Sequence, residues 1–436
     1  MSDEILGLVA LGFLFIVIFL GFPIAFTLGA VAILTGWYAL GPMVLDLAVL
    51  QTFSVMKDTV LASIPFFLFM GFLLEQSGLM ERMFIGIQQL LAGLRGSLYL
   101  AVLITATIFA AATGIVGSSV TLLGVMAGPT MIKSGYDTRM SAGAITAGGT
   151  LGILIPPSVM LIVMGPVVGV PATDLFTAAI IPGLLLSSIF IVWCLFRCWL
   201  NPDLGPALPE ELRPKSLGPV IRDLLIGVAP VIVVIVSTLG VILMGIATPT
   251  DAGAVGCAAV FLLTALSGRM TWEKIRKSAY ATLEVSSMIL MLVASSNLFG
   301  AVFSRLGSAE FLANLLTGLS LPPMLMLIVI LGLIFVLGWP LEWVPIVLIV
   351  VPIVLPIVQA AGIDLVWFCT LVAMTLQTAW LSPPVALSAY FLKGVVPQWE
   401  LKEIYAGMVQ FMILQVVGVG ALLLFPELAT WLVNSG

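Results

Sequence analysis

The sequence predicts an all-α polytopic membrane protein made of two inverted repeats, and three observations support this fold class. Of its 436 residues, 61% are hydrophobic and only 8% are charged, whereas soluble domains are about one quarter charged because their surfaces face water. The apolar residues form segments that, at roughly 20 residues per crossing, allow about ten spans. Proline- and glycine-rich motifs also recur at a nearly constant spacing, which indicates an internal duplication.

The composition also excludes several classes of function. The chain has no histidine, which removes histidine-dependent triads, the metalloprotease HExxH pair and histidine proton relays. Its four cysteines are scattered without a CxxC pair, so neither a disulfide framework nor a metal cage is predicted. The absence of a GxxxxGK[ST] loop and of a GxGD pair disfavours an ATP-driven pump and an intramembrane enzyme. The apolar composition makes a lipid bilayer the expected surroundings, and the net charge of −5 indicates that nucleic acid is not a partner.

The spans can be placed from the apolar segments and the breaks between them. The N-terminus has no basic residue and no cleavage site, so its apolar segment is expected to be a retained span and not a signal peptide. Residues 5–40 are too long for one crossing and break at 21–23, which gives two spans. Residues 80–96 mix polar with apolar side chains, as is typical of an interfacial arm helix. The other expected spans are 61–75, 140–168, 174–197, 224–245, 246–268, 284–300, 364–392 and 404–432.

Two further apolar segments are interrupted near their centres. Residues 97–136 break at the glycine- and serine-rich 114–119, and residues 322–362 break at 338–342, which contain glycine, proline and glutamate. Non-helical backbone at membrane depth is tolerated only where it lines a cavity or is buried in protein. We therefore expect two re-entrant hairpins, although two pairs of full spans would fit the same lengths.

The positive charges fix the orientation. With ten spans and two re-entrant hairpins, all of the 16 lysines and arginines except Lys57 and Arg305 fall on one side of the membrane. The positive-inside rule makes that side the cytoplasm, so both termini are expected outside. The proline-rich, charged segment 201–223 is then a cytoplasmic linker between a first repeat, 1–200, and a second repeat, 224–436.

The duplication rests on residues that match between the two repeats. At a shift of 227 residues, the matches are Pro129 with Pro356, Gly135 with Gly362, Asp137 with Asp364, and Pro156 and Pro157 with Pro383 and Pro384. Each repeat holds five of the ten expected spans, an odd number, so the second copy must insert upside down. Inverted repeats are typical of secondary transporters, whose site lies at the midplane where broken helices meet. The pattern therefore indicates a carrier.

The broken helix 140–168 suggests what the carrier binds. Three glycines between residues 148 and 152 weaken the helix, and Pro156 and Pro157 remove amide donors, so carbonyl oxygens are freed in a low-dielectric setting. Such carbonyls, with serine and threonine hydroxyls, can coordinate sodium. We expect the first hairpin tip to bring Ser118 and Ser119 to this break. The alternative is that glycine and proline serve only kinks and close helix packing. The symmetric site would combine 338–342 with Gln377, Thr378 and Ser382 of the broken helix 364–392.

Acidic residues leave two alternatives open. The expected cavity elements contain no Lys or Arg, so a bound carboxylate would be held by helix N-termini, backbone amides and hydroxyls, beside sodium. Glu342 is either a site residue at the second hairpin tip or a residue exposed in an outward vestibule. Asp251 either caps the helix that begins beside it or takes part in coupling.

Several motifs together carry a family resemblance. They are GSS at 117–119, PTM at 129–131, GYD at 135–137, GGTLG at 148–152, IPPS at 155–158, ATPTDA at 247–252, PIVLP at 352–356 and PP at 383–384. Over almost the whole chain, this set resembles the large membrane subunit of the tripartite ATP-independent periplasmic (TRAP) transporters. Two departures suggest a cavity reshaped for a different substrate. Ala379 and Trp380 stand where the family usually has a glycine, and Trp339 is bulky for a hairpin tip.

The resemblance implies an elevator-type carrier in the bacterial inner membrane, with both termini in the periplasm. It implies import of a small organic acid (a carboxylate) driven by a Na⁺ gradient, a small four-helix membrane subunit, and a periplasmic binding protein that delivers the substrate. A rival of related architecture is a sodium- or proton-coupled dicarboxylate or anion carrier that needs no binding protein. The expected sodium ligands are Ser118, Ser119, Gly149 and Thr150, with a second set at Gly338, Gln377 and Thr378. Substrate contacts are expected at Gly117, Ser158, Glu342 and Ser382.

Overall fold

The computed structural model of the chain describes residues 2–207, 213–214, 216–318, 321–339, 341–383 and 386–435. Throughout these residues the regular structure is helical, without a strand, which confirms the predicted all-α class. Among them, six helices are long and apolar enough to cross a membrane, or seven if the bent pair α4 and α5 (Ser63–Ser77 and Leu79–Leu90) forms one span. The chain is therefore a polytopic membrane protein, while the count of ten spans stays a prediction.

In the first half, helices end where glycine and proline predict. α1 (Asp3–Phe19) and α2 (Ile24–Leu40) are separated at Gly21, whose φ is +92°. Gly78, with φ of +71°, lies between α4 and α5, and these two helices are bent by 60°. The predicted arm 80–96 is an α-helix only as far as Leu90. The other helices are α3 (Met43–Lys57), α6 (Ser97–Thr113), α7 (Val116–Lys133), α8 (Thr138–Thr150), α9 (Val159–Val168) and α10 (Ala172–Leu200).

In the second half, two predicted spans have different limits. The span 284–300 is the middle of α14 (Trp272–Arg305), whose 34 residues extend about 51 Å and exceed a hydrocarbon core of about 30 Å. The span 404–432 is two helices, α21 (Leu401–Leu424) and α22 (Glu427–Ser435), which are separated at Pro426. The other helices are α11 (Leu217–Ile235), α12 (Val241–Leu243), α13 (Pro249–Leu266), α15 (Ser308–Thr317), α16 (Pro323–Leu337), α17 (Trp343–Pro345), α18 (Val351–Ala360), α19 (Leu365–Ala379) and α20 (Leu387–Val395).

The interruptions expected in both hairpins and both broken helices are present. In the first half, Gly114 ends α6, and residues 151–158 separate α8 from α9. In the second half, 338–342 separate α16 from α17, and 380–386 separate α19 from α20. Within these second-half interruptions, Pro340, Pro384 and Val385 lie outside the described residues.

The two broken helices also begin in the same way. The side chain of Asp137 accepts a hydrogen bond of 2.8 Å from the Met140 amide and caps α8. The side chain of Asp364 accepts one of 2.8 Å from the Trp367 amide and caps α19. An N-cap side chain satisfies an amide that has no partner within its helix. The two matched aspartates therefore have the same local role.

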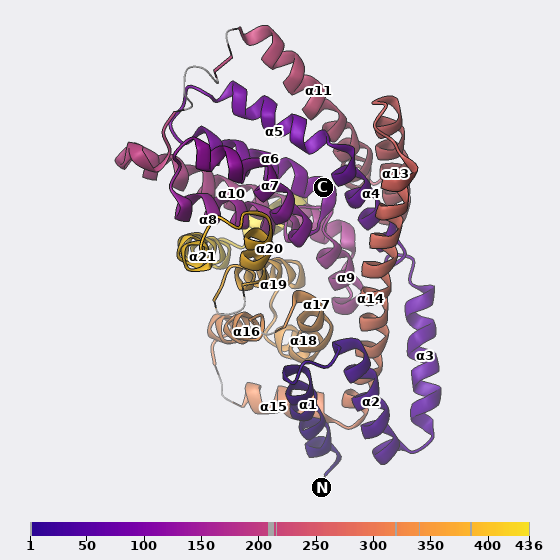
Figure 1. Cartoon of the computed structure of the whole chain (residues 1–436). Helices are drawn as coiled ribbons and strands as arrows, with labels where there is room; N and C mark the ends of the chain where they lie inside the picture. Colours follow the sequence, from indigo (N-terminus) through magenta and orange to yellow (C-terminus); the bar gives the residue numbers. More distant parts are fainter. Residues whose placement is uncertain are drawn as a thin grey trace.

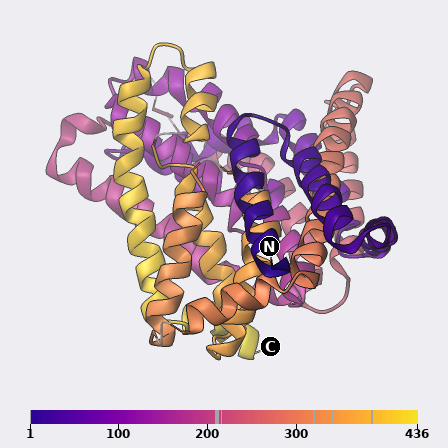
Figure 2. The same ribbon diagram turned by 90° about the horizontal axis from the view of Figure 1, so that it is seen from below.

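Helices from the two halves pack against each other in three matched sets. α5 packs on α11 while α15 packs on α1, α4 packs on α13 while α14 packs on α2, and α8 packs on α21 while α19 packs on α10. In Figure 1, α5 and α11 lie at one end of the molecule and α15 and α1 at the other, with α14 running along one side. Figure 2 shows the yellow α21 against purple helices of the first half. The two halves are thus interlocked and do not form separate bodies.

The contact between α8 and α21 depends on the absence of a side chain at Gly407. A Cβ built on Gly407 would lie 1.9 Å from the carbonyl oxygen of Arg139, and one built on Gly143 would lie 2.5 Å from the ring of Phe411. Real Cβ atoms do not approach backbone this closely. Glycine at these positions is therefore required for the two helices to touch.

We predict that Gly407→Ala lowers the stability of the purified protein by roughly 1–3 kcal/mol, the usual cost of overpacking a tight contact. The measurement is the thermal unfolding midpoint in one detergent. Gly420→Ala is the matched control in the same helix, since a Cβ there meets nothing within 4 Å and alanine favours helix. An equal midpoint for the two variants would contradict the close packing of α8 on α21.

Candidate functional site

A cavity of about 250 Å³ lies where helix interruptions from both halves meet. Its wall includes Gly117 beside the first hairpin break, Ser158 at the start of α9, Glu342 before α17, and Trp380 after α19. A second cavity, of about 260 Å³, also contains Glu342 and Trp380 in its wall. Three of the four residues predicted to contact a substrate therefore border one space.

The fourth of these residues, Ser382, borders neither cavity. Its hydroxyl donates to the Thr378 carbonyl at 2.7 Å and lies 3.0 Å from the sulfur of Met412. The Ser382 side chain thus bonds the second break to the last turn of α19. Whether any of the four residues contacts a substrate stays a prediction.

The first hairpin contacts the first broken helix through glycines. Gly114 has φ of +64°, and a Cβ on it would lie 2.9 Å from the Pro157 carbonyl oxygen. A Cβ on Gly149 would lie 2.3 Å from the side chain of Val120. Because glycine has no side chain, α7 can lie directly on α8. This close approach explains the glycine at 149 without any ligand, while its carbonyl remains a candidate sodium ligand.

Thr150 joins the two halves. Its hydroxyl donates to the Ala147 carbonyl at 2.8 Å and accepts hydrogen bonds from the side-chain amides of Gln377 at 3.1 Å and Gln415 at 3.3 Å. All three side chains are fully buried. The amide oxygens of Gln377 and Gln415 have no hydrogen-bond partner. Buried polar atoms normally have partners, so these two oxygens are acceptors available to a bound cation or water.

The contact between Thr150 and Gln377 links the two predicted sodium sets, which were expected at separate sites. The two residues are 227 positions apart, the same shift that relates the two repeats. The described residues contain no cluster of three His, Cys, Asp or Glu side chains that could hold a metal. A cation here would therefore depend on neutral oxygens, which suit sodium.

The other predicted sodium ligands lie near the interruptions, in different settings. Ser119 is buried and donates to the Ile115 carbonyl at 2.6 Å, and the buried Thr378 hydroxyl donates to the Thr375 carbonyl. Gly338 ends α16, where a Cβ would lie 2.7 Å from that of Ala379. Ser118 lies apart from this group, beside the carboxyl of Glu75.

Asp251 has a structural role at the start of α13. Thr248 is the N-cap, and its hydroxyl accepts a hydrogen bond of 3.2 Å from the Asp251 amide and donates one of 2.7 Å to the Asp251 carboxylate. The Thr248 hydroxyl satisfies one amide at the helix N-terminus, that of Asp251. Thr248 is thus the cap of α13, and the Asp251 carboxylate accepts a hydrogen bond from the capping hydroxyl.

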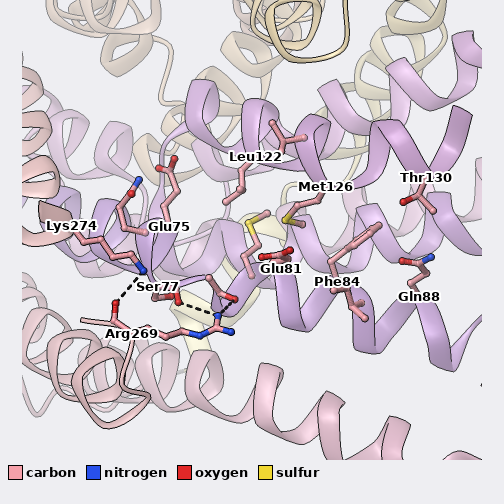
Figure 3. A pocket seen from close by; sticks show the side chains of 15 residues that line it. Glu75, Ser77, Glu81, Phe84, Gln88, Leu122, Met126, Thr130, Arg269 and Lys274 are labelled. Carbon is pink, nitrogen blue, oxygen red and sulfur yellow. Dashed lines mark hydrogen bonds between the residues drawn. The ribbon is translucent and has the colours of Figure 1, made fainter. Parts of the chain in front are cut away.

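A larger cavity, of about 830 Å³, lies at the bend between α4 and α5 (Figure 3). Glu75 and Glu81 line it together with Arg269 and Lys274. Arg269 donates to the Gly78 carbonyl at 3.1 Å, and the Lys274 ammonium donates to the Arg269 carbonyl at 3.1 Å. Both cations are thus held by backbone at the junction of α4, α5 and α14.

Two residues of these sites were not predicted from the sequence. Gln415 is a buried amide within the apolar α21, and Glu75 is a carboxylate near the end of the apolar α4. A lone polar side chain in a membrane helix is a signal of function or of helix contact. That signal marks both positions but does not reveal that Gln415 reaches Thr150.

Comparison with known proteins identifies the family. Residues 11–428 match the family model described as "Tripartite ATP-independent periplasmic transporter, DctM component". The chain belongs to this family. The predicted resemblance to the large membrane subunit of TRAP transporters is thereby confirmed.

Individual relatives agree with this assignment. The C4-dicarboxylate TRAP transporter large permease protein DctM of Rhodobacter capsulatus is 28% identical over 406 residues, which cover 89% of this chain and 90% of that protein. The sialic acid TRAP transporter large permease protein SiaM of Vibrio cholerae is 28% identical over 386 residues, 88% of each chain. The crystal structure of the Alcanivorax borkumensis YdaH transporter has a TM-score of 0.63 at 14% identity and covers 90% of this chain and 89% of that one, a likeness of fold alone.

Family membership settles the class of activity. TRAP large permeases are secondary transporters and not enzymes. The chain is therefore a membrane-embedded bacterial permease that takes part in solute transport dependent on a periplasmic binding protein. The family implies a small membrane subunit and a periplasmic binding protein as partners.

We predict that Thr150→Val lowers the unfolding midpoint in sodium-free buffer more than Thr146→Val does. Valine at 150 leaves the amide donors of Gln377 and Gln415 without an acceptor, at about 1–3 kcal/mol for each. Thr146 is equally buried in the same helix, but its hydroxyl donates only to the Ala142 and Gly143 carbonyls. Equal midpoints for the two variants would show that Thr150 does not join the halves.

Proposed function

We propose that this chain imports a small organic acid across the bacterial inner membrane, driven by a sodium gradient and by an elevator movement. A periplasmic binding protein delivers the substrate, and a small four-helix subunit accompanies the chain in the membrane. The observation that carries the proposal is the contact of Thr150 with Gln377, because it joins equivalent residues of the two halves beside unpaired amide oxygens.

The proposed inverted repeats draw support from that same contact. Two residues related by a two-fold axis can touch only where the axis passes between them. Thr150 and Gln377 differ by the repeat shift and are hydrogen-bonded, which is the arrangement expected on such an axis. The matched caps Asp137 and Asp364 and the three matched sets of helix contacts favour the same relation. We propose repeats at 1–200 and 224–436, ten spans, two re-entrant hairpins at 97–136 and 322–362, and interfacial arms.

Sodium coupling is proposed from the chemistry of the oxygens at the interruptions. Sodium is a hard cation that carbonyl and hydroxyl oxygens bind where helices are broken. The first proposed set offers lone pairs of the Ser119 hydroxyl and carbonyls freed between α8 and α9. At Thr150, sodium would take the place of one of the two amides that donate to its hydroxyl, those of Gln377 and Gln415. The second set, with Gln377 and Thr378, adds an amide oxygen without a partner. The amide oxygen of Gln415, whose nitrogen donates to Thr150, also has no partner and is a further candidate sodium ligand.

An organic acid is proposed from the donors that face the small cavity. The first turns of α7 and α9 border it, and neither N-cap residue makes a side-chain capping bond. Amides at helix N-termini attract anions. The named relatives are transporters of C4-dicarboxylates and sialic acid, which are acids. Membership of a family whose members depend on a periplasmic binding protein disfavours the rival carrier that needs none.

Both termini are proposed to lie in the periplasm. That orientation places most lysines and arginines on the cytoplasmic side, as the positive-inside rule requires.

We predict that replacing choline or potassium with sodium, at constant ionic strength, raises the unfolding midpoint of the purified chain. A ligand that binds only the folded state stabilises it by mass action. Thr150→Val should reduce this sodium-specific rise, whereas Thr146→Val should keep it, whatever their midpoints without sodium. A rise of equal size with potassium, or one unchanged in Thr150→Val, would contradict the proposed sodium site.

A further inference from the structure

The cavity at the helix interruptions has a negative side chain and no described cation in its wall. Glu342 is the one charged residue among the described residues that line it, and the same holds for the adjoining cavity. Glu342 is an exposed residue, and no described residue that lines either cavity supplies a cation to its carboxylate. A carboxylate at the edge of an apolar space attracts an opposite charge more strongly than one in open water does. The cavity therefore favours an occupant that carries positive charge at this end.

Aromatic residues line the same two cavities as this carboxylate. Trp343, Trp380 and Phe391 line the first cavity, and Trp339 and Trp380 line the second. The rings of Trp380 and Phe391 are nearly parallel, with 19° between their planes and 6.5 Å between their centroids. The face of an aromatic ring attracts a cation within about 6 Å, most strongly for tryptophan. A carboxylate among aromatic faces is suited to an ammonium group.

The wall of the first cavity also offers hydrogen-bond donors to an anion. Val116 and Gly117 begin α7, Val159 and Met160 begin α9, and all four line the cavity. Amides in the first turn of a helix have no partner within the helix. The residues that line the cavity therefore include possible anion donors from the first half of the chain and a carboxylate from the second.

We propose that the substrate is a small zwitterion, an organic acid that also carries a positively charged, alkylated nitrogen. The Glu342 carboxylate and the faces of Trp343 and Trp380 hold the nitrogen, while the first turns of α7 and α9 hold the carboxylate. This inference rests on the proposed transport function and narrows its substrate class. The volume of about 250 Å³ equals roughly eight water molecules at about 30 Å³ each, so the substrate is small.

The test compares two probes of the same shape. Glycine betaine carries a trimethylammonium group and a carboxylate, whereas 3,3-dimethylbutanoate has carbon in place of the charged nitrogen. Binding of radiolabelled glycine betaine to the purified chain in sodium buffer is competed with each unlabelled compound. We expect glycine betaine to compete at a concentration at least tenfold lower. We expect Glu342→Gln to weaken its binding at least tenfold, and Glu342→Asp, which keeps the charge, to weaken it less.

Glu427→Gln is the control, because it removes an exposed carboxylate on the C-terminal helix α22 and should bind glycine betaine as the unmodified chain does. The inference is overturned if specific binding of glycine betaine is absent, if 3,3-dimethylbutanoate competes equally well, or if Glu342→Gln binds normally. The unfolding midpoint of the unmodified chain is measured in sodium and in potassium beside these assays, to separate the zwitterion inference from the proposed sodium-driven function. If sodium raises the midpoint and any of the three contradicting results is found, only the zwitterionic substrate is refuted. If sodium does not raise the midpoint, the proposed sodium-driven function is refuted as well.

Discussion

A helix that breaks inside a membrane leaves backbone carbonyls and amides that water cannot reach, and the protein must satisfy them. The described residues include the four interruptions expected from the sequence, which we propose lie inside the membrane. The first hairpin break contacts the first broken helix through Gly114 and Pro157. The cavity bordered by Glu342 and Trp380 lies where interruptions of both halves converge. The broken backbone therefore creates both the need for partners and the space in which a solute and its coupling ion can supply them.

The contact between the two halves at Thr150 bears on how the protein could change conformation. If two inverted halves share an axis there, interchanging their conformations exposes the same cavity to the opposite side of the membrane. Three sets of helix contacts match between the halves, as such an interchange requires. The charge distribution of the cavity does not follow this symmetry, since donors come from α7 and α9 and the carboxylate from Glu342. With the proposed inverted repeats, a symmetric scaffold would thus hold an asymmetric site.

Much of the fold could be predicted because the residues that begin and end its helices act locally. Glycine and proline act on their own backbone, so the interruptions at Gly114 and before α9 follow from composition, and Asp137 and Asp364 cap helices within three residues. Helices whose presence or length does not follow from an apolar segment were not predicted correctly. α3 was not expected, and α14 continues well beyond the apolar segment that predicted it. For the site, the hydroxyl and amide residues were foreseen, but the bond from Gln415 to Thr150 spans 265 positions and no local pattern encodes it. The placement of Ser118 beside Glu75 likewise depends on tertiary packing.

The central claim is that the broken helices of both halves form one sodium-responsive centre. Hydrogen–deuterium exchange of the purified chain, compared between sodium and potassium at equal ionic strength, tests it most directly, because bound ions slow the opening of the backbone that coordinates them. The account predicts slower exchange in sodium for peptides that cover 147–159 and 375–383 together, and unchanged exchange in α3 and α22. Slowing at only one of the two breaks, or at neither, would contradict a shared centre.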